Sequence, residues 1–358
     1  MPVSTARAAM LAGMAPVSGV DTISLPDAVG RVLAEDVVAP IDVPGHDNSA
    51  MDGFALRSAD LPRGGPARFT IVGESWAGRP CEHAVHAGQA VKVATGAVMP
   101  SGADTVVIQE RVRVAGDVLH VLDGERAGAN VRAAGEDTRA GEVALAEGTR
   151  LMPPEIGYLA SLGVRRVCAR RRVRVAFFST GDELVSVESG LPLQPGQVYD
   201  SNRHSLRAAL GALGVELRDL GIVLDDAAAT EAAFRTAASD ADAFIATGGA
   251  SVSEADHVAA TLRRHGEVTF WRVAMRPGRP LASGRFGDAH FFGLPGNPVA
   301  TLVSYYQFVL PALKRLMGCR ELTAPSVRVR CGSPLKKSSG RVEYQRGVLS
   351  WEDGEPVV

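Results

Sequence analysis

The second half of the chain alternates short apolar runs with helical patterns, and this alternation constrains the fold more than any other feature. Apolar runs at 173–179, 216–223, 243–247 and 291–294 are separated by helical patterns at 201–213, 227–238, 256–264 and 298–316. Such alternation is typical of βαβ units, in which helices cover both faces of a parallel sheet. We therefore predict an α/β fold with a three-layer βαβ domain over residues 173–318.

The rest of the chain follows other patterns. Residues 22–37 and 153–162 have helical periods, whereas 52–122 carries short alternating runs between Gly, Pro and Asp turns. We predict a β-rich domain at 52–129, set between a first segment, 1–51, and a helical or linker segment, 130–172. Residues 319–358 hold only two or three candidate strands, which rarely form a stable domain alone. We expect this last part either to pack on another part of the chain or to be incomplete.

Composition narrows the classes of partner. The 38 basic and 40 acidic residues give a net charge of -2, which disfavours bulk attraction to nucleic acid or to an anionic membrane. The apolar runs fall short of the roughly 20 residues that a membrane span needs, and the N-terminus lacks a signal-peptide pattern. The scattered Cys81, Cys168, Cys319 and Cys331 suit free thiols. We predict a cytoplasmic protein with small-molecule partners, binding neither nucleic acid nor membrane.

Three of the apolar runs end in polar turns. These turns read Ser179-Thr-Gly-Asp-Glu, Thr247-Gly-Gly-Ala-Ser and Gly293-Leu-Pro-Gly-Asn-Pro. Because parallel strands end at one edge of a sheet, ligands bind there, and the turn residues should line one cleft. The predicted lining is Asp182, Glu183, Gly248, Gly249, Ser251, Asp256, Gly296 and Asn297, with Asp225 and Asp226 after the 216–223 strand.

The residue types in these turns favour two ligands. Carboxylates and hydroxyls suit Mg²⁺, which takes oxygen ligands and bridges to substrate phosphates. Glycines let the backbone approach an anion, and the N–H groups that open a helix favour negative charge. Arg276 and Arg279 add two cations in the same half of the chain, and the planar guanidinium bonds two oxygens of an oxyanion at once.

Structural explanations compete with these assignments. Asp182 or Asp256 could simply cap a helix, and Pro295 and Pro298 could shape a helix start. The basic run at 165–174 is more typical of a solvated face or linker than of a site. Cys81, His83 and His86 have metal-ligand types, but a surface loop is the simpler interpretation. The chain has no dinucleotide, P-loop or serine-hydrolase motif.

The segment Asp47-Asn-Ser-Ala-Met-Asp-Gly-Phe-Ala55 resembles the signature of the molybdopterin molybdenumtransferases, the family of MoeA and the gephyrin E domain. Further matches follow in family order along nearly the whole chain. They are Ala28–Val37, Thr95–Ala97, Asn130–Arg132, Gly135–Asp137, Ser179–Leu184, Tyr199–Asn202, Thr247–Ser251, Glu254–Asp256, Leu294–Pro298 and Tyr344–Gly347. The family usually has Lys where Arg272, Arg276 and Arg279 stand, and Gly at Ser253.

The resemblance implies the final step of molybdenum cofactor biosynthesis, a Mg²⁺-dependent insertion of molybdate into adenylylated molybdopterin that releases AMP. It implies catalytic roles for Asp52, Glu183, Asp225 and Asp256, the last three also at the metal. The substrate-binding positions that we carry over or infer beside them are Thr95, Asp137, Gly248, Gly249, Ser251, Arg276, Arg279, Pro295, Gly296, Asn297 and Pro298.

The resemblance also implies how the molecule is assembled. It predicts an elongated homodimer, with 1–51 and 130–172 as linker and dimerisation domain, and an α/β domain resembling the molybdopterin adenylyltransferases. Predicted protein partners are a molybdopterin adenylyltransferase and recipient molybdoenzymes. The C-terminal β-barrel of the family is expected to be truncated at 319–358, which leaves an alternative: a molybdopterin-binding scaffold without full catalytic activity.

Overall fold

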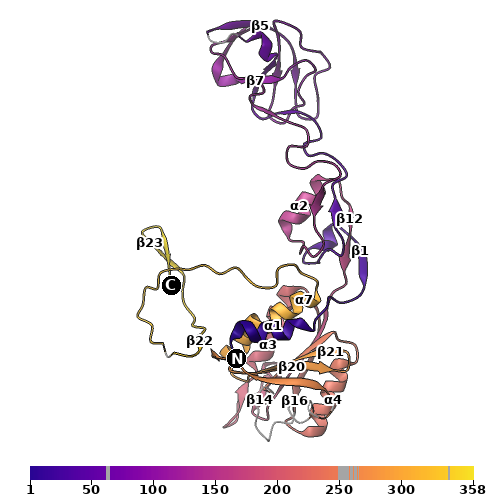
Figure 1. Cartoon of the computed structure of the whole chain (residues 1–358), viewed down its shortest axis with the longest axis vertical. Helices are drawn as coiled ribbons and strands as arrows, with labels where there is room; N and C mark the ends of the chain where they lie inside the picture. Colours follow the sequence, from indigo (N-terminus) through magenta and orange to yellow (C-terminus); the bar gives the residue numbers. More distant parts are fainter. Residues whose placement is uncertain (62–64, 249–257, 259–260, 262–263, 265, 338) are drawn as a thin grey trace. The chain divides into compact units, whose positions relative to one another are not determined.

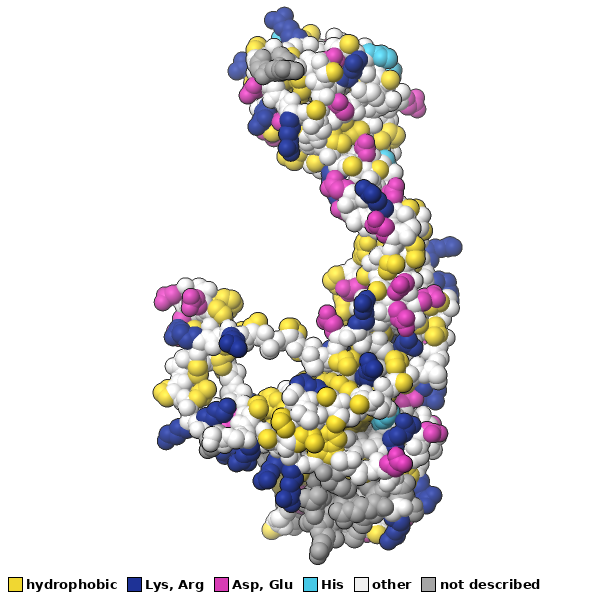
Figure 2. All heavy atoms as spheres, viewed as in Figure 1, with side chains coloured by type: hydrophobic (Ala, Val, Ile, Leu, Met, Phe, Trp, Pro, Cys, Tyr) yellow, Lys and Arg dark blue, Asp and Glu magenta, His cyan; other side chains and the backbone are white. Residues whose placement is uncertain are grey.

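The structure is a computed structural model that describes residues 1–61, 65–248, 258, 261, 264, 266–337 and 339–358. The chain forms two compact units (Figure 1). Unit 1 comprises Met1–Glu35, Glu147–Met152 and Cys168–Val358, and unit 2 comprises Asp36–Ala146 and Pro153–Val167. Each unit is described by itself. Lys and Arg side chains are interspersed with Asp and Glu on the face in view (Figure 2).

Unit 1 is built on a six-stranded sheet of order β16-β13-β17-β21-β20-β18. The strands are β13 (Arg174–Thr180), β16 (Glu216–Val223), β17 (Ala243–Thr247), β18 (Glu267–Arg272), β20 (Pro280–Phe286) and β21 (Ala289–Leu294). The first four in the sheet order are parallel, whereas β20 and β18 are antiparallel to their neighbours. The α/β prediction is confirmed, and the sheet is mixed because an antiparallel pair extends one side.

Helices cover both faces of this sheet (Figure 1). The helices of unit 1 are α1 (Val3–Ala12), α3 (Ser201–Leu213), α4 (Ala227–Ala238), α6 (Pro298–Ser304) and α7 (Leu310–Leu316). Successive side chains of a strand point to opposite faces. Phe177 of β13 therefore packs in a core with α1, α3 and α7, while Phe178 packs in a second core with Phe234 of α4. Two separate cores on the two faces give the three layers that the alternation predicted.

A π-helical turn, η5 (Tyr305–Val309), interrupts the helix predicted over 298–316. Pro311 follows it, and proline lacks the N–H that would bond to the carbonyl of Gln307 in a regular helix. A single π-turn accommodates this missing donor between α6 and α7.

Unit 2 contains a second six-stranded sheet of order β7-β4-β6-β5-β9-β8. Its strands are β4 (Gly53–Leu56), β5 (Ala67–Ser75), β6 (Gln89–Val93), β7 (Thr105–Ile108), β8 (Val112–Ala115) and β9 (Val118–Val121), with 3₁₀ turns η2 (Ser58–Asp60) and η3 (Gln109–Arg111). All of them lie within the predicted β-rich segment. The sheet buries Phe54 and Leu119 in one core and Ala55 and Val106 in another.

Short elements complete unit 2. β2 (Val37–Val38) pairs with β11 (Val143–Leu145), β3 (Asn48–Ser49) pairs with β10 (Val131–Arg132), and α2 (Pro153–Ser161) lies where a helix was predicted. The predicted domain borders remain predictions, because the two compact units divide the chain at other residues.

The helix predicted at 22–37 is wrong. This segment instead holds β1 (Val20–Ser24), which pairs with β12 (Arg166–Arg170), and the 3₁₀ turn η1 (Pro26–Ala28). Gly30 has a φ of 78°, a left-handed conformation that ends any helix there. The apolar residues that suggested a helical period include Leu25, Val32 and Leu33. Their side chains are buried, but the backbone that carries them is irregular.

The final residues carry three short strands in the described part of the chain. β22 (Val342–Glu343) pairs with β19 (Met275–Arg276), and β23 (Ser350–Glu352) pairs only with β24 (Glu355–Val357). The described residues of 319–358 thus form no closed barrel.

Two further strands, β14 (Leu184–Val185) and β15 (Val198–Tyr199), pair beside the 3₁₀ turn η4 (Val187–Ser189). No described helix combines the length and apolar character that crossing a membrane requires.

Candidate functional site

The strand register places the predicted polar turns at one edge of the unit 1 sheet. Thr247 at the end of β17 pairs with Ser179 of β13 on one side and with Leu294 of β21 on the other. Because β20 runs antiparallel to β21, the start of β20 at Pro280 lies at the same edge, and so does the end of β18 at Arg272. We call the segments 181–183, 224–226, 248, 276–279 and 295–297 the carboxyl edge.

Two turns of the carboxyl edge bring carboxylates together. The Asp225 N–H donates to Asp182 Oδ1 at 3.2 Å, which joins the turns after β13 and β16. The Glu183 carboxylate folds back over Gly181, where a Cβ would lie 2.7 Å from Oε2. The carboxylates of Glu183 and Asp225 are exposed and have no hydrogen-bond partner in the described part of the chain. Their oxygens are therefore available to a ligand.

The competing capping explanation applies to Asp226, not to Asp182. Asp226 Oδ1 accepts hydrogen bonds from the Ala228 and Ala229 N–H groups at the start of α4. The described residues contain no cluster of three His, Cys, Asp or Glu side chains placed to hold a metal. Asp256, the third predicted metal ligand, lies outside the described residues together with Gly249 and Ser251.

The turns after β17 and β21 meet at two glycines. The Gly248 N–H donates to Leu294 O at 3.2 Å, and a Cβ on Gly296 would make only an ordinary contact with the Gly248 Cα, at 3.8 Å. Gly248 itself requires glycine, because its φ is 96° and a Cβ there would lie 2.3 Å from Thr180 O at the end of β13. Both glycines are exposed, so main-chain surface is open at the carboxyl edge.

The turn after β21 has a structural role that the sequence also suggested. Asn297 Oδ1 accepts from the Val299 and Ala300 N–H groups, at 3.1 Å each, and so caps α6. Pro298 is the first residue of that helix, and Thr301 Oγ1 donates to Pro295 O at 2.5 Å. The side chain of Asn297 is thus already used within the fold.

Arg276 and Arg279 stand on a loop that is fixed through its backbone. Arg276 O accepts from the Tyr344 N–H at 2.8 Å, and Arg279 O accepts from the Val273 N–H at 2.9 Å. Gly278 between them packs so closely on Ser304 that a Cβ would lie 2.7 Å from its Oγ. Both guanidinium groups are exposed and unpaired among the described residues, so they can bind an anion.

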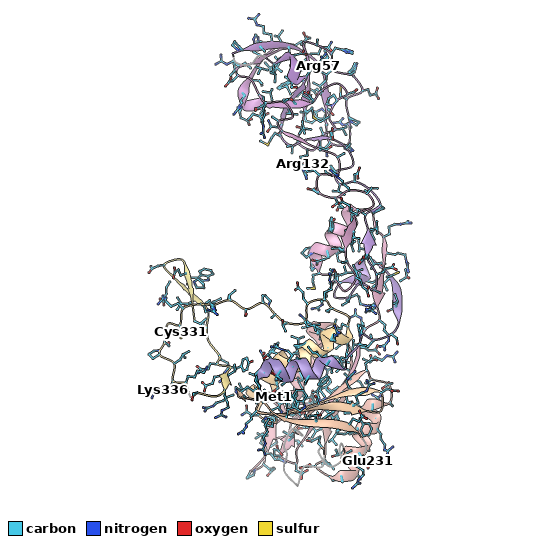
Figure 3. All side chains as sticks on the ribbon, viewed as in Figure 1. Met1, Arg57, Arg132, Glu231, Cys331 and Lys336 are labelled. Carbon is cyan, nitrogen blue, oxygen red and sulfur yellow. The ribbon has the colours of Figure 1, made fainter. Side chains whose placement is uncertain are left out.

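Three predicted site residues lie in unit 2. Asp52 Oδ1 accepts from the Thr95 N–H at 2.7 Å and from Thr95 Oγ1 at 2.9 Å, and these bonds lower the pKa of Asp52. Asp137 is paired with Arg132, which is labelled in Figure 3, at 2.6 Å. Asp52 is thus held as a carboxylate, while Asp137 is committed to an ion pair at the surface.

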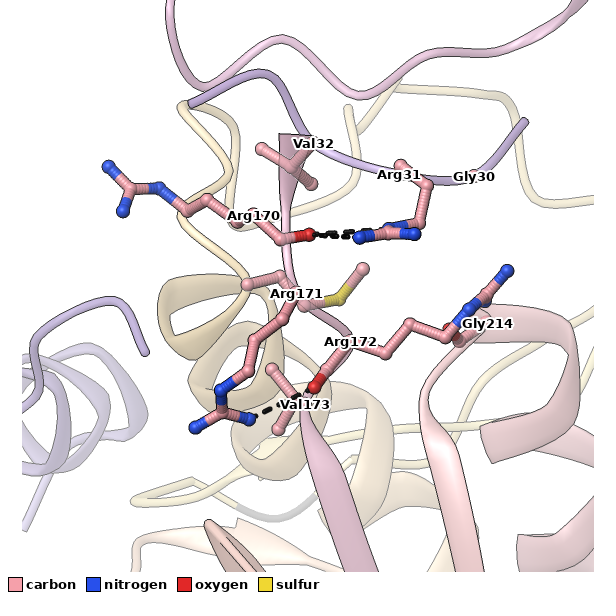
Figure 4. Close-up of a pocket in the computed structure, with 9 residues that line it drawn as sticks. Gly30, Arg31, Val32, Arg170, Arg171, Arg172, Val173 and Gly214 are labelled. Carbon is pink, nitrogen blue, oxygen red and sulfur yellow. Dashed lines mark hydrogen bonds between the residues drawn. The ribbon is translucent and has the colours of Figure 1, made fainter. Parts of the chain in front are cut away.

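The central arginines of the basic run, Arg170 to Arg172, are used within unit 1 (Figure 4). Arg31 donates to Arg170 O at 2.8 Å, and Arg172 donates to Gly214 O, which follows the end of α3, at 2.5 Å. Arg171 forms a two-point ion pair with Asp242, with both distances 2.7 Å. The arginines that line this cavity are therefore bonded within the fold, and Arg170 and Arg171 are partly buried and do not form a solvated face.

Two buried residues near the carboxyl edge were not among the predicted site residues. Asp200 and Asn202 stand at the start of α3, and Asn202 Nδ2 donates to Gly296 O at 2.7 Å. They belong to the Tyr199–Asn202 family match, which was the available signal.

Comparisons with known proteins agree along the chain. Residues 1–163 match the family model described as MoeA N-terminal region (domain I and II), and residues 176–315 match that of a probable molybdopterin binding domain. A molybdopterin molybdenumtransferase of Haemophilus influenzae is 41% identical over 344 residues, which are 96% of this chain and 84% of the relative. The chain belongs to the molybdopterin molybdenumtransferase family.

Other members of the family support the same conclusion. The molybdopterin molybdenumtransferase of a Nostoc species is 39% identical over 342 residues, covering 93% of this chain and 78% of its own. A crystal structure of the molybdopterin biosynthesis MoeA protein from Pyrococcus horikoshii OT3 superposes with a TM-score of 0.81 at 27% identity, covering 100% of this chain and 89% of that one. The prediction of an enzyme of this family is confirmed.

Proposed function

We propose that the chain catalyses the Mg²⁺-dependent insertion of molybdate into adenylylated molybdopterin with release of AMP, the final step of molybdenum cofactor biosynthesis. The observation that carries this proposal is the carboxyl edge of unit 1, along which carboxylates, exposed glycine turns and two free guanidinium groups lie in a member of this family. A reaction that releases a phosphate-containing product and consumes an oxyanion needs these three groups together.

Each group has a role that follows from its chemistry. Glu183 and Asp225 would hold Mg²⁺, because their exposed carboxylates supply the oxygen ligands that this ion prefers. When bound, the ion neutralises charge on the phosphate that leaves with AMP. Arg276 and Arg279 would bind the oxygens of molybdate or phosphate, and the backbone at Gly248 and Gly296 would admit the phosphates.

The remaining predicted residues are assigned roles from their place in the sequence and from the family match. Asp256, Gly249 and Ser251 follow β17 in sequence and belong to the proposed metal and phosphate set. Pro295, Asn297 and Pro298 would shape the turn that carries Gly296. Asp52, Thr95 and Asp137 of unit 2 are proposed to take part in catalysis and substrate binding, since they match the family's functional positions.

The proposal extends to assembly and location. We propose a homodimer that meets a molybdopterin adenylyltransferase and recipient molybdoenzymes in the cytoplasm. The four cysteines are free, which suits a reducing compartment. Sedimentation of the purified chain at several concentrations would test the dimer. The scaffold alternative is not favoured, because the matched relatives are named as enzymes.

The decisive experiment is molybdate-dependent AMP release from adenylylated molybdopterin. Glu183→Gln and Asp225→Asn each remove a charged metal ligand, and we expect each to slow release about 100-fold or more, since a bound metal contributes several kcal/mol. Asp240→Asn is the matched control, because Asp240 precedes β17 at the opposite edge, and its exposed side chain contacts exposed Arg218 and, at 3.5 Å, the Ser239 hydroxyl. Unchanged turnover in both test variants would contradict the proposed roles.

A further inference from the structure

Two buried oxygen atoms at the start of α3 lack hydrogen-bond donors. Asp200 is 3% exposed and Asn202 is 8% exposed, so both side chains lie in the packed fold at its margin with the carboxyl edge. Asp200 Oδ2 and Asn202 Oδ1 have no partner among the described residues. Buried polar atoms are almost always paired in folded proteins, and each exception calls for an explanation.

The other polar atom of each side chain is hydrogen-bonded, and these bonds fix the positions of the two free oxygens. Asp200 Oδ1 accepts from the Arg203 N–H at 3.1 Å and caps α3. Asn202 Nδ2 donates to Gly296 O at 2.7 Å, which holds the amide against the turn after β21. The Asp200 N–H donates to Val185 O, and the Val198 N–H donates to Glu183 O, so Asp200 is also tied to the turn after β13. The two free acceptors therefore adjoin the carboxyl edge.

We propose that Asp200 Oδ2 and Asn202 Oδ1 accept hydrogen bonds from the pyrimidine ring of the pterin, and so select the pterin end of the substrate. This inference rests on the proposed function and names the group that binds beside the phosphates. A pterin presents two donors, its ring N3–H and its 2-amino group, one for each of the two free acceptors.

The other groups of the substrates fit this pair less well. Phosphate and molybdate oxygens are acceptors, and they would leave both protein oxygens unpaired. The adenine edge alternates a donor with an acceptor. A cation is disfavoured because the N-terminus of α3, a helix of 13 residues, carries partial positive charge.

Titration of the whole chain with three small ligands tests the inference. The probes are 6-hydroxymethylpterin, its 2-oxo counterpart 6-hydroxymethyllumazine, and AMP, each measured with and without Mg²⁺. The lumazine has an acceptor where the pterin has its amino group, so the wild-type chain should bind the pterin about 10-fold or more tightly.

Three variants remove the acceptors in different ways. Asp200→Asn keeps the cap, since Asn and Asp cap helices equally well, but places an amide nitrogen where Oδ2 stood. Asp200→Ser keeps a cap with no second oxygen, and Asn202→Ala removes the other acceptor. Each should lower pterin affinity about 10-fold or more and leave AMP affinity unchanged.

Thr230→Val is the matched control. Thr230 Oγ1 is also buried without a partner in the described part of the chain, but it lies on α4, which packs on the other face of the sheet. The control should bind the pterin like the wild-type chain. Melting temperatures establish that every variant is folded.

Several results would overturn the inference. It is wrong if wild type does not distinguish pterin from lumazine, or if the Asp200 and Asn202 variants bind the pterin unchanged. An equal loss of AMP affinity would assign the pair to adenine, and a loss seen only with Mg²⁺ would assign it to a cation. Molybdate-dependent AMP release by the wild-type chain judges the proposed function separately, because pterin binding does not require turnover.

Discussion

At the residue scale, Asp242 anchors the strands of unit 1 through a charge network. Both of its oxygens accept from Arg171, and Oδ2 also accepts from the Arg174 N–H at 2.8 Å. Burial acts to raise the pKa of Asp242, but the hydrogen bonds from Arg171 and Arg174 outweigh it, and the pKa lies below the ordinary value. A carboxyl whose pKa is lowered by folding stabilises the folded state at pH values above its unfolded pKa of about 4. This stabilisation is lost as the pH falls through the folded-state pKa.

Asp242→Asn should therefore lower the free energy of unfolding at pH 7 by about 1.5–3 kcal/mol, the usual contribution of hydrogen bonds to a charged group. The difference from wild type should shrink below about pH 4, where the wild-type carboxyl also becomes protonated. Urea unfolding at several pH values measures both effects. Asp240→Asn removes the exposed pair with Arg218 and should change the free energy by less than about 1 kcal/mol. Equal effects at the two positions would contradict the assignment.

A second prediction at this scale concerns Asp52. Two hydrogen bonds lower its pKa: the larger effect comes from the Thr95 N–H and the smaller from the Thr95 hydroxyl. Thr95→Val removes only the hydroxyl, so the pKa of Asp52 should rise while staying below its ordinary value. Thr95→Ser should leave it lowered. Carboxyl carbon shifts followed by NMR against pH measure this directly, and identical titrations in all three proteins would show that the hydroxyl has no role.

At the scale of elements, the turn after β17 depends on Gly248. Gly248→Ala meets two obstacles, a φ of 96° and the Thr180 carbonyl at 2.3 Å from the new Cβ. We expect a loss of about 2–4 kcal/mol, from a strained backbone and a shift of the neighbouring strand end. Gly221→Ala is the control, because Gly221 has a φ of 78° with open space around it and should lose about 1 kcal/mol. Thermal unfolding of both variants tests whether the steric contact matters.

The elements show how far sequence patterns reach. The alternation after Val173 predicted α3, α4 and β17 at their observed ends, because buried strands and amphipathic helices have local signatures. The helix predicted at 22–37 is wrong because Leu25, Ala28 and Val32 stand at near-helical spacing but are buried by tertiary contacts of a backbone that forms no α-helix. The periodicity of apolar residues indicates which side chains are buried. It does not indicate which backbone conformation buries them.

Some residues of the candidate site could be predicted from the sequence and others could not. Glu183, Gly248 and Arg276 could be predicted, since parallel strands must end at one edge and polar turns are visible in the sequence. Asp200 and Asn202 could not be singled out, because their free oxygens become apparent only once Gly296 and the first turn of α3 are placed. Unsatisfied hydrogen bonds are a property of the packed fold.

At the scale of the whole molecule, the two units have separate hydrophobic cores. Phe234 and Leu210 are buried in cores of unit 1, whereas Leu119 is buried in a core of unit 2. Units with their own cores commonly unfold as separate cooperative transitions. We therefore expect two transitions in calorimetry of the intact chain.

Single truncations should assign the two transitions. Leu119→Ala removes a fully buried side chain of unit 2 and should destabilise one transition by about 2–5 kcal/mol, while Leu210→Ala should lower the other by a similar amount. AMP should raise only the transition that Leu210→Ala lowers, because the proposed phosphate-binding turns belong to unit 1 and a ligand stabilises the unit that binds it. One transition shifted by both variants would show that the two cores unfold together, and the site would then depend on the stability of the entire chain.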